Sequence, residues 1–501
     1  MSTTPNLAGA QVNAGMQVGP PGYQSIGLLL GPALFAIMMM LVDVQTTMNP
    51  LAWKVAAIGL WMAAWWATEA VPVPVTALLP IATFQLVGIS SMKEATEPYA
   101  NPIIYLFMGA FVLALAVERW NLHKRIALMI LGRTGTDGRR MIGGFMLVAA
   151  LLSMWMTNTS TTMMLFPIAI SVTAIIVENV AGLSEQAKQH FQIAMLLALA
   201  YAATIGGLAT LVGTPTNALL AAFLAENYGI EIGFARWMLI GVPVAAILLP
   251  AGWLLLTRWI YRVDIPESEE VKAHLQQLKN DLGPMSKPEA RVAIIFALVV
   301  LAWMVHRPLS AALGLEGLSD AGIAMAAAVL LFLVPSGDPK QEQLMSWHDV
   351  GRLPWGVLIL FGGGLSLASQ VSASGLATWL GESLSLLSAI GVIALVVAAT
   401  ALVIFLTELT SNLATTATFL PAVAAIAVQA DIAPPLLCVP VALAASCAFM
   451  LPVATPPNAI VYASGMLTIP QMVRAGLALN LIGLLLLSIV AIVWVPRILG
   501  L

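Results

Sequence analysis

The chain has 501 residues, of which 60% are hydrophobic and only 9% are charged, and its net charge is −3. This composition excludes an ordinary soluble domain, because so much apolar surface has to be covered by lipid. Nucleic-acid binding is excluded as well, since Lys and Arg cluster only in two loops.

The N-terminal residues 1–24 contain no charge and no long apolar core, so they are expected to form a disordered tail and not a signal peptide. From Tyr23 onward the chain repeats apolar stretches of about 20 residues, the length that crosses a bilayer as a helix. We therefore expect an all-α polytopic membrane protein with about eleven transmembrane helices.

Two hydrophilic segments, Glu118–Arg140 and Arg258–Arg291, hold 12 of the 21 Lys and Arg residues. The positive-inside rule places both in the cytoplasm. The apolar stretch between them is interrupted at 157–162 by TNTSTT, which favours side-chain to backbone bonding over a continuous helix. A re-entrant hairpin at 141–178 keeps both basic segments inside, whereas a simple crossing would export the second one. The same scheme makes the N-terminus cytoplasmic.

A second re-entrant hairpin is predicted at 388–428, around Ser411. Five crossings separate the two hairpins in this scheme, so they enter the membrane from opposite faces. That arrangement is an inverted repeat.

The chain also carries an internal sequence repeat. Residues 153–167, SMWMTNTSTTMMLFP, align without a gap on residues 407–421, TELTSNLATTATFLP, at an offset of 254. A second pair, VGTPTNA at 212–218 and VATPPNA at 453–459, is identical at five of seven positions. The matched residues are Asn, Thr and Pro, which favours a duplicated polar site. The alternative is that Pro and Thr only kink helices and Asn only joins them.

Irregular backbone at membrane depth is tolerated where it lines a cavity, so the repeated motifs predict one. Its expected lining is Asn amides and Ser and Thr hydroxyls, with no Lys or Arg. Half-helix N-termini would attract an anion, and bound cations would supply the missing positive charge. Hard oxygen ligands suit sodium, although they leave protons open. Glu408, the lone carboxylate in either hairpin core, either serves a cation or proton or orders the hairpin through backbone bonds.

These motifs, with TEAVPVPVTALLP at 68–80, resemble the divalent anion/sodium symporter family of dicarboxylate, citrate and sulfate carriers. The resemblance runs from about Ile26 to the end of the chain. It implies a homodimer in the bacterial inner membrane, in which a scaffold domain holds a transport domain that moves as an elevator. It also implies sodium as the coupling ion and no organic cofactor.

The resemblance and the repeat together divide the chain into segments. The expected segments are N-terminal scaffold helices at 25–100, a first inverted repeat at 101–262 with a broken helix at 191–228, a cytoplasmic loop at 263–290, further scaffold helices at 291–352, and a second inverted repeat at 353–501 with a broken helix at 435–468.

The family's functional positions carry over to matching residues of this sequence. Those implied to bind substrate are Asn158, Thr159, Thr214, Pro215, Asn412, Thr455 and Pro456. One implied sodium site uses Ser153, Thr157, Asn158 and Gly213, and the other uses Thr407, Thr410, Asn412 and Ala454. Leu413 departs from the family, which has threonine there, and removes one hydroxyl from the anion site.

The predicted function is a secondary active transporter that couples sodium to uptake of a small divalent anion, with a C4-dicarboxylate such as succinate implied by the family. The alternatives are a sodium-independent dicarboxylate exchanger, a sodium symporter for citrate, sulfate or another anion, and a channel. Opposed hairpins are typical of alternating access and not of a continuous pore. An enzyme is not expected, because the sequence has no HExxH motif and no paired aspartates in adjacent spans.

Overall fold

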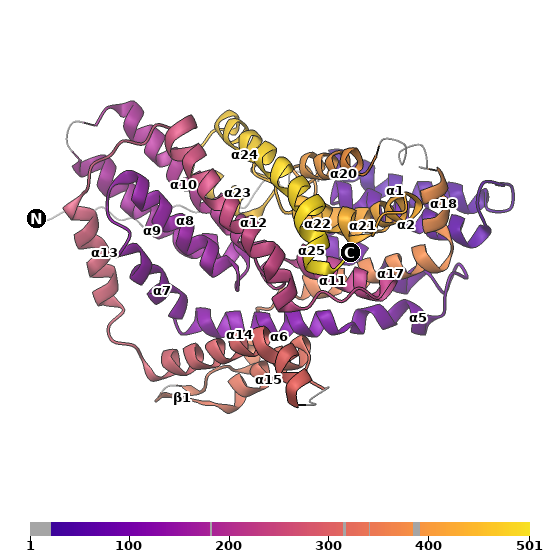
Figure 1. Ribbon diagram of the computed structural model, residues 1–501, viewed down its shortest axis with the longest axis horizontal. Helices are drawn as coiled ribbons and strands as arrows, with labels where there is room; N and C mark the ends of the chain where they lie inside the picture. The colour runs from indigo at the N-terminus through magenta and orange to yellow at the C-terminus, as the bar shows by residue number, and fades with distance from the viewer. Residues whose placement is uncertain (1–21, 181–182, 314–316, 340, 384–390) are drawn as a thin grey trace, which may run out of the picture.

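The computed structural model describes residues 22–180, 183–313, 317–339, 341–383 and 391–501. These residues are mostly helical, and the strands among them are β1 (Pro335–Asp338) and β2 (Gln341–Gln343), which form one antiparallel hairpin (Figure 1). Residues 1–21 of the predicted tail lie outside the described residues. Residues 22–24 are helical, so the tail prediction extends too far, because the first apolar helix begins at Gly22.

The N-terminal part is a series of apolar helices with short breaks. In chain order these are α1 (Gly22–Met40), α2 (Pro50–Thr68), α3 (Val73–Thr76), α4 (Leu79–Thr83), α5 (Met92–Thr96), the 3₁₀ turn η1 (Glu97–Ala100), α6 (Pro102–Arg119) and α7 (Leu122–Leu131).

The first polar motif lies between α8 (Gly138–Ser153) and α9 (Asn158–Asn179). Thr157 caps α9, because its hydroxyl accepts a hydrogen bond of 3.1 Å from the backbone N–H of Ser160. Downstream, α10 (Glu185–Gly207) and α11 (Pro215–Tyr228) are separated by an unwound loop. The Thr-Pro pair restarts the helix, since Thr214 is the N-cap and Pro215 is tolerated at the first helical position.

The second polar motif has the same local structure. It lies between α20 (Val392–Leu406) and α21 (Asn412–Gln429), and an unwound loop separates α22 (Pro435–Ala445) from α23 (Pro456–Tyr462). Here Thr455 caps the restarted helix, accepting a 3.3 Å hydrogen bond from the N–H of Asn458. The first residues of the predicted second hairpin, 388–390, lie outside the described residues.

The remaining helices connect and follow these parts. They are α12 (Phe234–Leu254) with its π-helical extension η2 (Leu255–Ile260), α13 (Glu269–Asp281), α14 (Lys287–Leu313), α15 (Asp320–Leu333), α16 (Trp347–Val350), α17 (Trp355–Ala373), α18 (Leu376–Ser383), α24 (Ile469–Ile489), the π-helical η3 (Val490–Trp494) and α25 (Val495–Leu499).

Within the segment predicted as a cytoplasmic loop, the structure has the amphipathic helix α13. Its N-terminus is explained by Ser268, whose hydroxyl accepts a hydrogen bond of 3.2 Å from the N–H of Val271. Glu269 and Glu270 in the first turn stabilise it further through the helix dipole.

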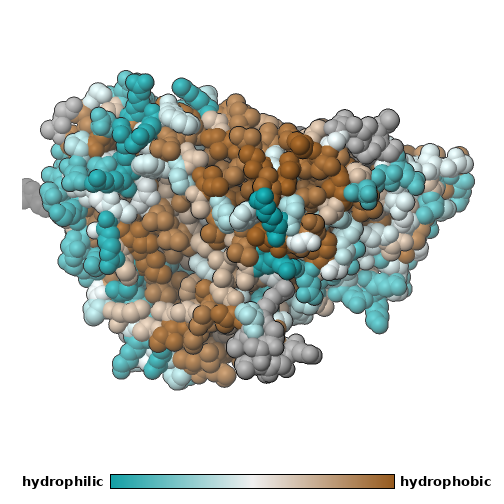
Figure 2. Space-filling view, in the orientation of Figure 1, coloured by the Kyte–Doolittle hydropathy of each residue, from teal (hydrophilic) through white to brown (hydrophobic). Residues whose placement is uncertain are grey.

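Among the described residues, eight helices are long and apolar enough to cross a membrane, and five shorter helices are also apolar. Hydrophobic side chains cover the middle of the molecule, while most hydrophilic ones gather at its left and right ends (Figure 2). The apolar middle is the part of this surface suited to contact lipid. The pair α8 and α9 lies to the left of the centre and the pair α20 and α21 to the right (Figure 1).

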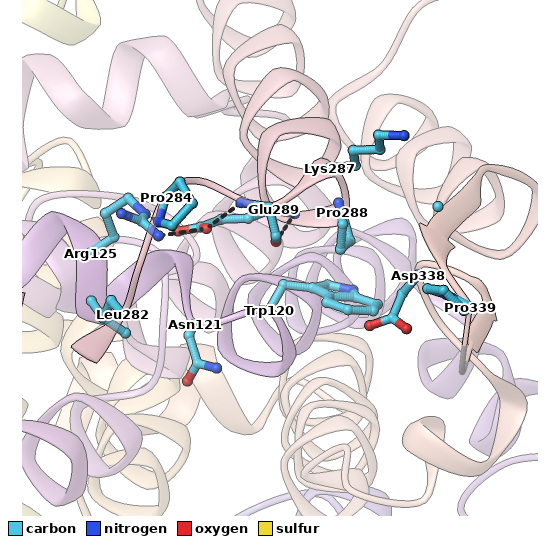
Figure 3. Close-up of a pocket in the computed structure, with 12 residues that line it drawn as sticks. Trp120, Asn121, Arg125, Leu282, Pro284, Lys287, Pro288, Glu289, Asp338 and Pro339 are labelled. Carbon is cyan, nitrogen blue, oxygen red and sulfur yellow. Dashed lines mark hydrogen bonds and ion pairs between the residues drawn. The ribbon is translucent and has the colours of Figure 1, made fainter. Parts of the chain in front are cut away.

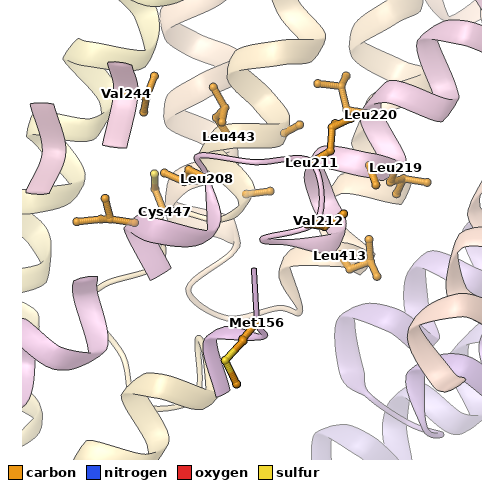
Figure 4. Close-up of a cluster of buried hydrophobic side chains, with 14 of the residues drawn as sticks. Met156, Leu208, Leu211, Val212, Leu219, Leu220, Val244, Leu413, Leu443 and Cys447 are labelled. Atoms are coloured by element: carbon orange, nitrogen blue, oxygen red, sulfur yellow. The ribbon is translucent and has the colours of Figure 1, made fainter. Parts of the chain in front are cut away.

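The core surrounds the two broken helices. The unwound loop after α10 carries Leu208 and Leu211, which are buried beside Leu443 and Cys447 from the other broken helix (Figure 4). Helices α8 and α10 touch at backbone level, because a Cβ on Gly206 would clash with the carbonyl group of Ala150. This contact packs the first half of the first broken helix directly against α8.

Candidate functional site

The turn between α8 and α9 is called tip 1, and the turn between α20 and α21 is called tip 2; together they are the hairpin tips. A cavity of about 960 Å3 lies where the two hairpin tips and the two unwound loops meet. Helices α9, α11 and α21 begin at its wall, so their N-terminal partial positive charges lie beside it. All seven residues predicted to bind substrate line this cavity: Asn158, Thr159, Thr214, Pro215, Asn412, Thr455 and Pro456.

The two asparagines at the hairpin tips are held in matching ways. In the first tip the hydroxyl of Ser153 donates to Oδ1 of Asn158 at 2.5 Å. In the second tip Oγ1 of Thr407 lies 2.9 Å from Oδ1 of Asn412 and 2.7 Å from the carbonyl oxygen of Ala445. The matched residues of the sequence repeat therefore make matched contacts.

The unwound loops are also stabilised alike. Nδ2 of Asn217 donates to the carbonyl oxygens of Gly207 at 3.1 Å and Thr210 at 2.8 Å. At the repeat-related positions, Nδ2 of Asn458 donates to Ala448 at 3.2 Å and Leu451 at 3.0 Å. Each amide thus replaces hydrogen bonds that the broken helix has lost.

The first predicted sodium site has a donor set that suits a small cation. Two oxygens face the same small space beside Gly207. If a Cβ is built on Gly207, Oδ1 of Asn158 lies 2.7 Å from it and the carbonyl oxygen of Gly213 lies 3.1 Å from it. Thr157 lines the cavity beside them. Asn217 follows Gly213 by four residues, and its Oδ1 is buried with no hydrogen-bond partner among the described residues. Neutral, hard oxygens of this kind fit sodium.

The second predicted sodium site is assembled less completely. Thr407 and Asn412 are in contact, and Ala454 lines the cavity. Thr410 is directed elsewhere, since its hydroxyl contacts the carbonyl oxygen of Leu406 at 3.0 Å and Oγ1 of Thr415 at 2.6 Å. Ligation by Thr410 would require that hydroxyl to turn.

Glu408 organises the backbone of the second unwound loop. Its buried carboxylate accepts hydrogen bonds from the N–H groups of Phe449 at 2.8 Å, Met450 at 3.0 Å and Leu451 at 3.0 Å. Nδ2 of Asn480 donates a further bond of 2.7 Å. Of the two roles left open by the sequence, these contacts favour ordering of the hairpin and its neighbouring loop.

The expectation that the cavity has no basic residue is wrong. Arg352 lines it and forms an ion pair with Glu118, which comes from the end of α6. Glu69, part of the TEAVPVP motif, also lines it. These three residues lie outside both hairpins in the sequence. The only sequence signal for this part of the wall is the TEAVPVP motif that contains Glu69.

Much of the remaining wall is apolar. Met156, Val212 and Leu413 line it close to the polar hairpin tips (Figure 4). Leu413 occupies the position that the repeat relates to Thr159, so one tip offers a hydroxyl where the other offers a hydrocarbon side chain.

A separate cavity of about 420 Å3 lies between the start of α14, the turn before α7 and the β-hairpin (Figure 3). The ion pair of Arg125 and Glu289 spans its wall, and Ser286 donates its backbone N–H to the same carboxylate at 3.2 Å. Arg125 and Glu289 therefore compensate each other in this wall.

A polytopic helical protein whose broken helices enclose a polar cavity is a membrane transport protein. The sequence model of the sodium:sulfate symporter transmembrane region matches residues 24–501. The chain therefore belongs to this family of membrane transporters and is not an enzyme.

Two relatives illustrate the similarity. The sodium-dependent dicarboxylate transporter SdcS of Staphylococcus saprophyticus is 40% identical over 480 residues, which cover 95% of this chain and 92% of the relative. SdcS of Staphylococcus aureus is 41% identical over 486 residues, with the same coverage.

The fold is also similar to solved transporter structures. The YdaH transporter of Alcanivorax borkumensis gives a TM-score of 0.54 at 13% identity and covers 95% of this chain and 99% of its own. MtrF of Neisseria gonorrhoeae gives a TM-score of 0.54 at 10% identity and covers 93% of this chain and 94% of its own. At these identities the likeness concerns the fold alone.

Proposed function

We propose that the chain is a secondary active transporter that couples sodium to uptake of a small divalent anion, a C4-dicarboxylate such as succinate. The observation that carries this proposal is the single cavity lined by all seven predicted substrate residues. The relatives named as sodium-dependent dicarboxylate transporters support the choice of ion and of substrate class.

The neutral donors of the hairpin tips explain why the anion and the cation would travel together. A divalent anion removed from water without a fixed positive partner is costly. Cations held by Ser153, Asn158 and Gly213, and by Thr407, Asn412 and Ala454, would lower that cost directly beside the substrate. Anion binding would then strengthen cation binding, and the converse.

The two polar motifs would act as inverted repeats within a transport domain. The matched contacts of Asn158 and Asn412, and of Asn217 and Asn458, support this relation. The transport domain would move as an elevator against a scaffold formed by residues 25–100 and 291–352. The protein would work as a homodimer in the bacterial inner membrane, with its N-terminus in the cytoplasm.

The test is uptake of labelled succinate by purified protein in sealed vesicles, with and without an inward sodium gradient. Uptake driven by the gradient is the expected result. Uptake only into vesicles preloaded with dicarboxylate, regardless of sodium, would establish an exchanger instead. Uptake of citrate or sulfate but not succinate would keep the sodium symporter and replace its substrate, and a lack of trans-stimulation would indicate a channel.

A further inference from the structure

We propose that Glu69 promotes release of the anion to the cytoplasm, by repelling it while the cavity is open to that side. The inference rests on the proposed function, because it requires an anionic substrate in this cavity. It assigns a role to the TEAVPVP motif, which lies outside both hairpins.

The charges on the cavity wall are unequal. Among the lining residues that the structure describes, the charged ones are Glu69, Glu118 and Arg352. Glu118 and Arg352 form an ion pair and largely cancel each other. The carboxylate of Glu69 makes no hydrogen bond or ion pair within the described part of the chain. The wall therefore carries one uncompensated negative charge.

Glu69 is held in place by its turn. It ends α2 in the left-handed region, with φ 47° and ψ 38°, and its backbone N–H bonds to the carbonyl oxygen of Trp65. The buried Trp66 closes the turn by donating Nε1 to the carbonyl oxygen of Val73 at 3.2 Å. A left-handed conformation is uncommon for a residue other than glycine and persists where the surroundings fix it. The backbone that carries Glu69 is thus fixed at the wall.

This part of the wall faces the cytoplasm. Glu69 lies directly after the C-terminal end of α2, and Arg352 lies before the N-terminal end of α17. The opposite ends of these two helices are adjacent, because Asn49 donates Nδ2 to the carbonyl oxygen of Ser374 at 2.8 Å. Glu69 and Arg352 therefore share one end of the helix pair, and Glu118 joins them through its ion pair. The first basic segment begins at Glu118, which places this end in the cytoplasm. The side chain of Arg352 is 54% exposed, so the cavity opens here to water.

The repulsion would act in one state of the transport cycle only. Glu69 belongs to the proposed scaffold, whereas the anion is held by the proposed transport domain. When the transport domain moves outward, the anion leaves the neighbourhood of Glu69, and the repulsion disappears because it weakens with distance and screening. Glu69 therefore lowers affinity for the anion on the cytoplasmic side without lowering it on the outer side.

The experiment compares Glu69→Gln with wild type using succinate in inside-out and right-side-out membrane vesicles. The expected result is a cytoplasmic-side KM that falls by about 3- to 10-fold, the size typical of one unpaired charge near a binding site, with an unchanged outer KM. The difference should shrink at high ionic strength. Glu97→Gln is the matched control, because Glu97 is exposed in η1 and does not line the cavity.

Glu69→Asn separates charge from backbone, since asparagine tolerates the left-handed conformation better than most residues. The two neutral variants should shift the cytoplasmic-side KM alike. An unchanged KM in both variants, or an equal change on both sides of the membrane, would overturn the proposal. If wild type carries sulfate and not succinate, the proposed substrate fails, and the same comparison with labelled sulfate still tests Glu69.

Discussion

The two hairpin tips present the same asparagine to the cavity but are supported by different surroundings. Tip 1 is anchored by an aromatic residue, because Trp155 stacks on Phe234 of α12 with ring centroids 5.9 Å apart. At the repeat-related position of tip 2, the side chain of Leu409 is 69% exposed and, carrying no ring, has no such aromatic support. The contact between the asparagine and its neighbouring hydroxyl is therefore shared between the tips, whereas the packing that supports it is not.

The unwound loops beside the tips differ in the same way. In the first half Oγ1 of Thr210 donates to the carbonyl oxygen of Met154 at 2.5 Å and accepts the N–H of Gly213 at 3.0 Å. In the second half Glu408, at the position related to Met154, collects several N–H groups on one carboxylate. A neutral hydroxyl in one half thus does the work of a carboxylate in the other, so the duplicated motifs keep their asparagines while the groups that support them diverge.

The largest effect is expected where the tips are alike. Asn158→Ala and Asn412→Ala should each abolish uptake, because each removes an amide that lines the cavity and contacts the adjacent hydroxyl. Uptake per amount of folded protein in vesicles measures this, and Asn280→Ala on the exposed face of α13 is the control. If both variants still transport, the cavity is not the substrate site.

A smaller but substantial effect is expected at Glu408. Glu408→Gln replaces one acceptor oxygen by a donor and leaves buried N–H groups unsatisfied, at about 1–3 kcal/mol for each one. We expect a lower thermal unfolding temperature and a rise of about tenfold or more in the sodium concentration for half-maximal uptake. Met154→Leu in the first tip is the control, because only the backbone carbonyl of Met154 makes the contact. Sodium dependence like that of wild type would separate Glu408 from the cation site.

The hairpin tips and unwound loops could be predicted from the sequence because their signals are local. TNTSTT and the two Thr-Pro pairs are helix caps and first-turn residues, and their offsets identify matched positions. The wall formed by Glu69, Glu118 and Arg352 could not be predicted, since it depends on which distant helices meet. Glu408 could be identified as the lone carboxylate of the hairpin cores, but its partner Asn480, 72 residues away, could not. The helix α13 was missed because it is short and polar.

The aromatic support of tip 1 gives a direct test of the difference between the tips. Trp155 also stacks on Trp303 with ring centroids 6.4 Å apart and meets Phe296 edge-on at 5.2 Å. Each such pair contributes about 0.5–1.5 kcal/mol beyond its buried area. Trp155→Ala should therefore raise the KM for succinate about tenfold, while Leu409→Ala should change it less than about twofold. Equal effects on the two tips would show that Trp155 does not position the first one.

The smallest effect is expected at the pair Thr159 and Leu413, where the tips differ inside the cavity itself. Leu413→Thr adds a hydroxyl to a wall that is buried and apolar, and one hydrogen bond to a charged group contributes about 1.5–3 kcal/mol when it is well formed. Threonine also leaves more space than leucine, which offsets part of that gain. We therefore expect competition assays to shift by about 3- to 10-fold toward dicarboxylates.

Thr159→Val is the matched change in the other tip, and it should shift the same competition assay away from dicarboxylates. If the two tips hold opposite ends of one dicarboxylate, the double variant Leu413→Thr with Thr159→Val should restore one hydroxyl at the site, but at the other end of the substrate. Its selectivity for a symmetric acid such as succinate should then lie close to that of wild type. An acid with two unlike ends should distinguish the double variant from wild type, because the hydroxyl now faces the other end. Unchanged selectivity in Leu413→Thr would mean that position 413 does not contact the substrate, and that the tips differ only in their supports.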